Sequence, residues 1–209
     1  MKEKRFGFIA VIGPPNAGKS TLSNALAGQK VAIVTHKAQT TRARLRAVVM
    51  HEQSQVVLVD TPGIFSGVKK LDKAMVQEAW SGAEEADAVL VVLDASRALP
   101  AETELVLAGV KNTSKPVILV LNKVDAVKRE KLLELTQQLN EAANFADTFM
   151  VSALKETGLE ELKSYLAQLV PEGPWHYPED MAADVPSLLL AAEGTREKLF
   201  LRLHQELPY

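Results

Sequence analysis

The sequence contains no cysteine among its 209 residues, which excludes disulfide frameworks and thiolate metal sites. A chain without disulfides fits the reducing cytoplasm, and we expect it there. Long hydrophobic runs are missing as well. The apolar segment 6–12 is too short to cross a membrane, and no stretch approaches 18 apolar residues. The sequence therefore predicts a globular protein without a membrane-spanning segment.

A strong excess of positive charge is also absent, because the formal net charge is −2. A protein that grips a nucleic-acid backbone by itself usually shows a basic face. The segment 29–50 is a local exception, with no acid and five basic residues: Lys30, Lys37, Arg42, Arg44 and Arg46. It is either a solvated loop or a contact for phosphate or RNA.

Short apolar runs alternate with helical patterns, which is typical of an α/β protein with a mostly parallel sheet. We predict six strands: 6–12, 45–51, 55–60, 88–94, 116–122 and 148–152. The second and third are close enough for an antiparallel hairpin at the sheet edge. Helices are predicted over 19–27 and around two leucine stripes, one from Leu132 to Leu139 and one from Leu159 to Leu166. A capping box of Thr157 and Glu160 is predicted to start the last helix.

The segment 13–20 matches G-x-x-x-x-G-K-[ST] between a predicted strand and a predicted helix, which is the context that this motif requires. In such a loop, successive N–H groups and the positive end of the helix face phosphate oxygens. We expect Lys19 to contact the β- and γ-phosphates and Ser20 to bind Mg²⁺. The nucleotide-binding residues predicted here are Gly13, Pro14, Pro15, Asn16, Ala17, Gly18, Lys19, Ser20 and Thr21.

Two further motifs follow apolar strands. In the first, made of Asp60, Thr61, Pro62 and Gly63, the carboxylate is placed to hold Mg²⁺ through water and the Gly63 N–H to meet the γ-phosphate. Such a tetrapeptide alone is most often a turn. The second, Asn122-Lys123-Val124-Asp125, predicts the base: the Asp125 carboxylate can accept two hydrogen bonds from guanine, and adenine offers neither donor.

The segment Ser152, Ala153 and Leu154 follows the last predicted strand, where its backbone can contact the base oxygen. All four motifs lie at the carboxyl ends of strands, the rim at which open α/β sheets bind ligands. Together they predict the three-layer fold of a P-loop GTPase, with GTP or GDP and Mg²⁺ as its ligands.

These motifs, with Lys37-Ala38-Gln39-Thr40-Thr41-Arg42, Ile64 and the proline-rich segment 171–180, resemble the Era family of bacterial GTPases within the TrmE/Era/Der class. The resemblance implies GTP hydrolysis, binding of 16S ribosomal RNA through a C-terminal KH domain, and a role in assembly of the small ribosomal subunit. It also implies a cytoplasmic protein with a fraction peripheral to the inner membrane. The phosphate loop alone fits related tRNA-modifying GTPases equally well.

The resemblance also implies catalytic roles. Thr40 and Thr41 are candidates for a second Mg²⁺ ligand, and related Thr-Thr-Arg sequences favour Thr41, with a surface threonine as the alternative. Ras-like GTPases orient the attacking water with a glutamine after the glycine that corresponds to Gly63, where this chain has Ile64. We therefore expect slow intrinsic hydrolysis, with Lys19, Thr41, Gly63 and Asn16 as the catalytic set and K⁺ bound at Asn16. A nucleotide-sensing module with negligible hydrolysis is the alternative.

The predicted organisation is a GTPase domain over 1–170, a linker over 171–186, and the helical start of a truncated KH domain over 187–209. From residue 171 onward there are three basic residues against seven acidic ones, and no G-x-x-G sequence. RNA binding by this chain is therefore expected to be weak or lost. We expect a monomer in which Leu199, Phe200 and Leu203 form an apolar strip that favours self-association or poor order after residue 180.

Overall fold

The chain forms one six-stranded sheet in the strand order β2-β3-β1-β4-β5-β6. The computed structural model describes residues 3–31, 45–60, 80, 83–181 and 195. The strands are β1 (Arg5–Ile12), β2 (Leu45–His51), β3 (Ser54–Asp60), β4 (Ala88–Asp94), β5 (Val117–Asn122) and β6 (Asp147–Met150). All neighbouring pairs are parallel except β2 and β3, which form the predicted antiparallel hairpin at one edge. The predicted fold class is confirmed.

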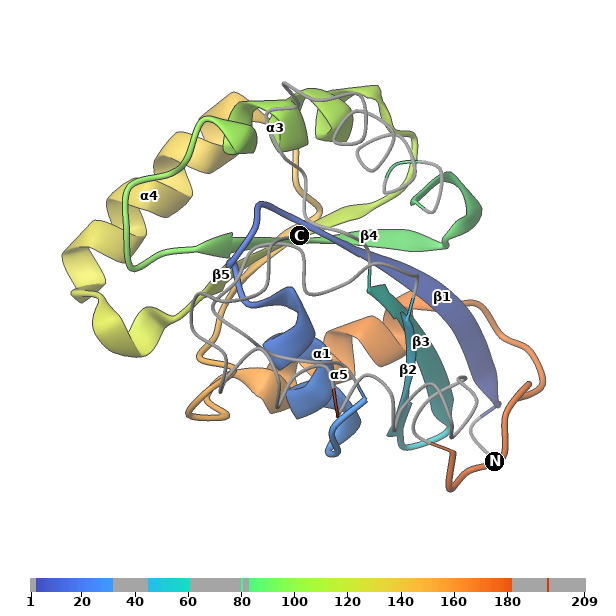
Figure 1. Cartoon of the computed structure of the whole chain (residues 1–209). Helices are drawn as coiled ribbons and strands as arrows, with labels where there is room; N and C mark the ends of the chain where they lie inside the picture. Colours follow the sequence, from blue (N-terminus) through green and yellow to red (C-terminus); the bar gives the residue numbers. More distant parts are fainter. Residues whose placement is uncertain (1–2, 32–44, 61–79, 81–82, 182–194, 196–209) are drawn as a thin grey trace.

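Helices cover both faces of the sheet (Figure 1). The described helices are α1 (Lys19–Ala27), α3 (Glu102–Asn112), α4 (Arg129–Ala142), α5 (Leu159–Leu169) and the short 3-10 helix η1 (Val124–Ala126). Alternate residues of β1 serve the two layers: Ile9 and Val11 pack with α1 and α5, and Ala10 and Ile12 pack with α3 and α4. Central strands buried on both faces explain why their sequences are continuously apolar.

Two details differ from expectation near α5. The last strand ends at Met150 and not at Ser152, because Ser152 forms an isolated bridge with Thr157 through two backbone hydrogen bonds. The capping box is wrong for the same reason. Thr157 belongs to that bridge, and the residue before α5 is Gly158 with φ +73°, where a Cβ would lie 2.6 Å from the Met150 carbonyl oxygen.

The proline-rich segment packs against the sheet at the end where β1 begins. The Phe6 N–H donates to the Pro171 carbonyl at 3.0 Å, and the Trp175 indole N–H donates to the Gln53 carbonyl at 3.0 Å. The Phe6 ring stacks on His176 with centroids 3.8 Å apart. The first part of the predicted linker, up to residue 177, thus packs against the β2–β3 hairpin and β1.

Three expectations for the tail, namely the linker residues 182–186, the helix over 187–209 and its apolar strip, lie outside the described residues apart from Thr195. Within the part of the chain that the structure describes, no helix has both the length and the apolar character needed to cross a membrane.

Candidate nucleotide-binding site

The loop between β1 and α1 turns its carbonyl groups toward donors of the protein. Lys19 Nζ donates to the carbonyls of Gly13 at 3.1 Å and Pro14 at 3.0 Å. The next three carbonyls are also hydrogen-bonded: Pro15 by Arg97 at 3.2 Å, Asn16 by Lys123 at 2.8 Å and Ala17 by Asn122 at 3.0 Å. Five consecutive carbonyls are therefore held by side chains, an arrangement suited to a loop whose N–H groups receive phosphate.

Lys19 lies inside this loop with 7% of its surface exposed. Burial lowers its pKa from 10.5 to about 8, and the negative charge of Asp60 opposes that shift. A buried ammonium group has much to gain from an anion, because a phosphate oxygen would replace the water that burial removed. The predicted phosphate contact thus has a physical basis in this structure.

Ser20 and Asp60 meet at the mouth of the loop. The Ser20 hydroxyl donates to Asp60 Oδ2 at 2.7 Å, and Asp60 is only 1% exposed at the carboxyl end of β3. A hydroxyl beside a buried carboxylate is an all-oxygen donor set of the kind that Mg²⁺ prefers. These two residues fit the predicted metal, and Thr21 lies partly buried in the same first turn of α1.

Asn122 joins three of the predicted motifs. Its Nδ2 donates to the Ala17 carbonyl at 3.0 Å, and its Oδ1 accepts the N–H of Lys123 at 2.8 Å and that of Ala153 at 3.1 Å. Its neighbour Gly18, with φ +93°, has no room for a side chain, because a Cβ there would collide with Asn122 Nδ2. The phosphate loop and the two base motifs are thus assembled around one buried amide.

The residues expected to read the base lie at the open side of this assembly. Asp125 is exposed in η1, and Leu154 is 76% exposed in the turn after β6. Ser152 is buried instead, and its hydroxyl accepts the Lys155 N–H at 3.1 Å. A free carboxylate and an apolar side chain beside the phosphate loop suit the edge and the face of a planar base.

Asp94, Ser96 and Arg97 belong to the same network but were not predicted from the sequence. Asp94 ends β4 beside Asn122, its register partner on β5, and accepts a hydrogen bond from Lys123 Nζ at 2.7 Å. Burial acts to raise the pKa of Asp94, but the hydrogen bonds from Lys123 and Ser96 hold it below its usual value. The sequence pattern that could have identified Asp94 is an aspartate at the end of a continuously apolar strand, and the same pattern is found at Asp60.

Several predicted site residues lie outside the described residues. They are Thr40 and Thr41 of the basic segment, and Thr61, Pro62, Gly63 and Ile64 after β3. Their roles stay predictions. The part of the site that is described contains the phosphate loop, one candidate Mg²⁺ carboxylate and both base motifs.

Comparison with known proteins finds similarity to GTPases. A family model described as 50S ribosome-binding GTPase matches residues 8–123. GTPase Era of Sinorhizobium medicae is 54% identical over 205 residues, which cover 98% of this chain and 66% of that protein. A crystal structure of Era in complex with MgGDPNP and nucleotides 1506–1542 of 16S ribosomal RNA has a TM-score of 0.89 and 38% identity, over 98% of this chain and 70% of that one.

The chain belongs to the Era family of GTPases. A second Era structure, from Aquifex aeolicus with GDP and AlF4⁻ bound, matches with a TM-score of 0.88 and 38% identity. The chain spans about two thirds of the length of the curated Era relatives. Membership in the Era family sets aside the alternative of a tRNA-modifying GTPase, which the phosphate loop alone left open.

Proposed function

We propose that this chain binds GTP with Mg²⁺, hydrolyses it slowly to GDP, and acts as a nucleotide switch in 16S ribosomal RNA processing and assembly of the small ribosomal subunit. The observation that carries the proposal is the buried Asn122 amide, which brings the phosphate loop and the base motifs to one place. The ribosomal part is supported by the Era relative that was crystallised with 16S ribosomal RNA. Peripheral association of a cytoplasmic protein with the membrane belongs to the same proposal.

Each predicted site residue has one task in this proposal. Lys19 neutralises the β- and γ-phosphates from inside the loop, and Asp125 accepts the guanine N1–H and amino hydrogens. Ser20 and Asp60 would hold Mg²⁺ directly or through water, with Thr41 as a further ligand. The bound ion supplies positive charge to the phosphate oxygens. Gly63 would present its N–H to the γ-phosphate, so that the segment after Asp60 responds to hydrolysis.

Guanine selectivity tests the proposal directly. GTP should displace a fluorescent GDP analogue, whereas ATP at a thousandfold excess should not. Asp125→Asn should weaken GTP binding about a hundredfold, because hydrogen bonds to a charged group each contribute about 1.5–3 kcal/mol. Asp180→Asn removes the same charge at an exposed position of the linker and serves as the control. Competition by ATP on equal terms, or wild-type affinity in Asp125→Asn, would refute guanine recognition.

The rate of GTP hydrolysis distinguishes the proposed switch from the alternative of a nucleotide sensor with negligible hydrolysis. Ile64 cannot hydrogen-bond water, so a chain acting alone should turn over slowly, and single-turnover rates should rise when small ribosomal subunits are added. Release of phosphate would be followed at saturating protein. A rate that stays at the uncatalysed level with and without subunits would favour the sensor.

Potassium is part of the proposed mechanism. Asn16 lies in the phosphate loop with φ +60°, and its side chain is the candidate ligand for a K⁺ that takes the place of an arginine finger. Hydrolysis should be faster in K⁺ than in Na⁺ at equal ionic strength. GTP affinity is measured in both salts, so that an effect on binding is recognised. Equal single-turnover rates at saturation would contradict the role of K⁺.

A further inference from the structure

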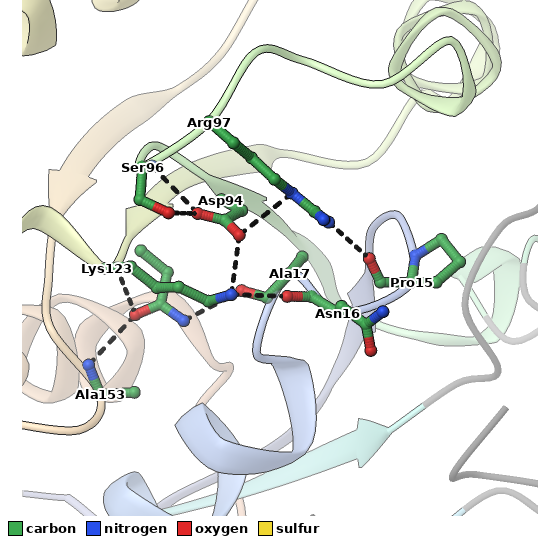
Figure 2. Close-up of polar contacts among 9 residues, drawn as sticks. Pro15, Asn16, Ala17, Asp94, Ser96, Arg97, Lys123 and Ala153 are labelled. Carbon is green, nitrogen blue, oxygen red and sulfur yellow. Dashed lines mark hydrogen bonds and ion pairs between the residues drawn. The ribbon is translucent and has the colours of Figure 1, made fainter. Parts of the chain in front are cut away.

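We infer that Arg97 is a positioning residue that fastens the phosphate-binding loop to Asp94 and thereby slows nucleotide release. Its guanidinium group spans two partners. Nε lies 3.2 Å from Asp94 Oδ2, and Nη2 donates to the Pro15 carbonyl at 3.2 Å (Figure 2). None of the sequence motifs contains Arg97, which lies just after the end of β4. The inference rests on the proposed nucleotide binding and adds a residue to it.

Asp94 is a rigid anchor for this contact. Its side chain is only 5% exposed, and Oδ1 accepts both the N–H of Ser96 at 2.9 Å and its hydroxyl at 2.6 Å. The other oxygen, Oδ2, faces both Arg97 and Lys123. A carboxylate held by two hydrogen bonds of its own cannot follow its cationic partners, so it fixes where they point.

The side chains of Arg97 and Lys123 each bind one of two consecutive backbone carbonyls of the phosphate-binding loop. Arg97 takes the carbonyl of Pro15, and Lys123 takes that of Asn16. Asn16 adopts the left-handed conformation, in which neighbouring N–H groups can face a common anion. Rotation of either peptide plane would turn a carbonyl oxygen toward a phosphate oxygen, and such a contact is repulsive. Arg97 and Lys123 together oppose that rotation.

This geometry predicts how the effect divides among kinetic constants. Loop amides of this kind contact the α- and β-phosphates, which GDP and GTP share. Loss of the Arg97 contact should therefore speed the release of both nucleotides by the same factor, about three- to tenfold for a half-exposed charged hydrogen bond. The rate of hydrolysis at saturating GTP should change less than the two release rates, because Arg97 bonds the loop from outside and we assign it no contact with the γ-phosphate.

The test is stopped-flow release of mant-GDP and mant-GTP from the 209-residue chain and its variants. Arg97→Ala should release both nucleotides faster, with a smaller change in the single-turnover rate and an unchanged circular dichroism spectrum. Lys111→Ala removes one positive charge at the last turn of α3 and should behave as wild type. Arg97→Lys keeps the charge but offers one nitrogen where Arg97 uses two, so its release rate should fall between wild type and Arg97→Ala.

Asp94→Asn adds a double-mutant cycle. If Arg97 acts through Asp94, the double variant should release nucleotide about as fast as Asp94→Asn alone. Wild-type release rates in Arg97→Ala, full restoration by Arg97→Lys, an equal effect of Lys111→Ala, or additive effects in the cycle would each overturn the inference. Failure of the wild-type chain to bind mant-GDP would instead refute the proposed function.

Discussion

The ammonium group of Lys19 shows how a single residue can oppose stability and serve binding. It is buried among the carbonyls of its own loop, and its pKa falls to about 8. In the unfolded chain the pKa returns to 10.5, so the unfolded chain binds more protons between these two values. The stability of the nucleotide-free protein therefore rises with pH across this window and is lowest where Lys19 is charged.

Urea unfolding at pH 7.5 and pH 9.5 checks this prediction. The free energy of unfolding of the wild type should increase by about 2 kcal/mol relative to Lys19→Met, which cannot titrate. The comparison between the two proteins cancels the contributions of all other groups. An equal change with pH in both would show that Lys19 is not destabilised by burial.

At the scale of single residues, the sequence indicated which described residues lie together better than it indicated the hydrogen bonds that join them. Lys19, Ser20, Asp60 and Asn122 lie together because fixed motifs place them at the ends of neighbouring strands. The role of Asp94 depends on which strand neighbours β5 in the sheet, and the register that sets Asp94 beside Asn122 is not visible in either segment alone. The Ser152 hydroxyl accepts a local backbone hydrogen bond, and the predicted contact between the backbone of 152–154 and the base oxygen stays a prediction.

Among the elements, the β2–β3 hairpin makes contacts at both of its ends. Leu45 and Asp60 are register partners at the nucleotide end. At the other end the fully buried Gln55 binds the linker: its Oε1 accepts the N–H groups of His176 at 3.0 Å and Tyr177 at 2.9 Å, and its Nε2 donates to the Tyr177 carbonyl at 2.9 Å. One side chain thus satisfies three backbone groups of the linker.

Gln55→Leu should release the linker. Three backbone groups would lose their partner, and we expect the free energy of unfolding to fall by about 2–4 kcal/mol, with new chymotrypsin cleavage after Trp175. Gln138→Leu, at an exposed position of α4, is the matched control. A variant as stable and as protease-resistant as the wild type would contradict a structural role for Gln55.

Element boundaries followed the strength of the local pattern. The helix over 19–27 and the strand 88–94 were predicted with the bounds that the structure has, because a phosphate loop precedes the first and a continuously apolar run forms the second. The strand 45–51 also has its predicted bounds. Helix α3 was not predicted, since its buried positions, Thr103, Val106 and Val110, form a weak stripe. The capping box failed because a bridge to Ser152 competes for Thr157.

At the scale of the whole molecule, the charge and the length of the chain affect the RNA binding that we expect. The segment from residue 171 onward is acidic and has no G-x-x-G sequence, and the chain spans about two thirds of its curated relatives. The predicted division into 1–170, 171–186 and 187–209 stays a prediction. The segment 171–177 packs against β1 and the β2–β3 hairpin, so part of the predicted linker contacts the predicted GTPase domain.

This chain alone should bind RNA weakly. By fluorescence anisotropy at about 150 mM salt, an RNA corresponding to nucleotides 1506–1542 of 16S ribosomal RNA should bind no better than a scrambled RNA of equal length. The same measurement with GTP and with GDP controls for nucleotide state. A tenfold preference for the ribosomal sequence would contradict the expectation and direct attention to the basic segment 29–50.

Strand β3 is hydrogen-bonded on both sides along its whole length, to β1 and to β2. A strand paired in this way cannot slide unless its hydrogen bonds to both β1 and β2 break. It is therefore expected to move together with these two strands. One end of β3 carries the Asp60 carboxylate proposed to bind magnesium, and the opposite end, about 20 Å away at roughly 3.3 Å per residue, binds the segment 176–177 through Gln55. We therefore expect a tilt of β3 at the Asp60 end to move the segment bound at the other end.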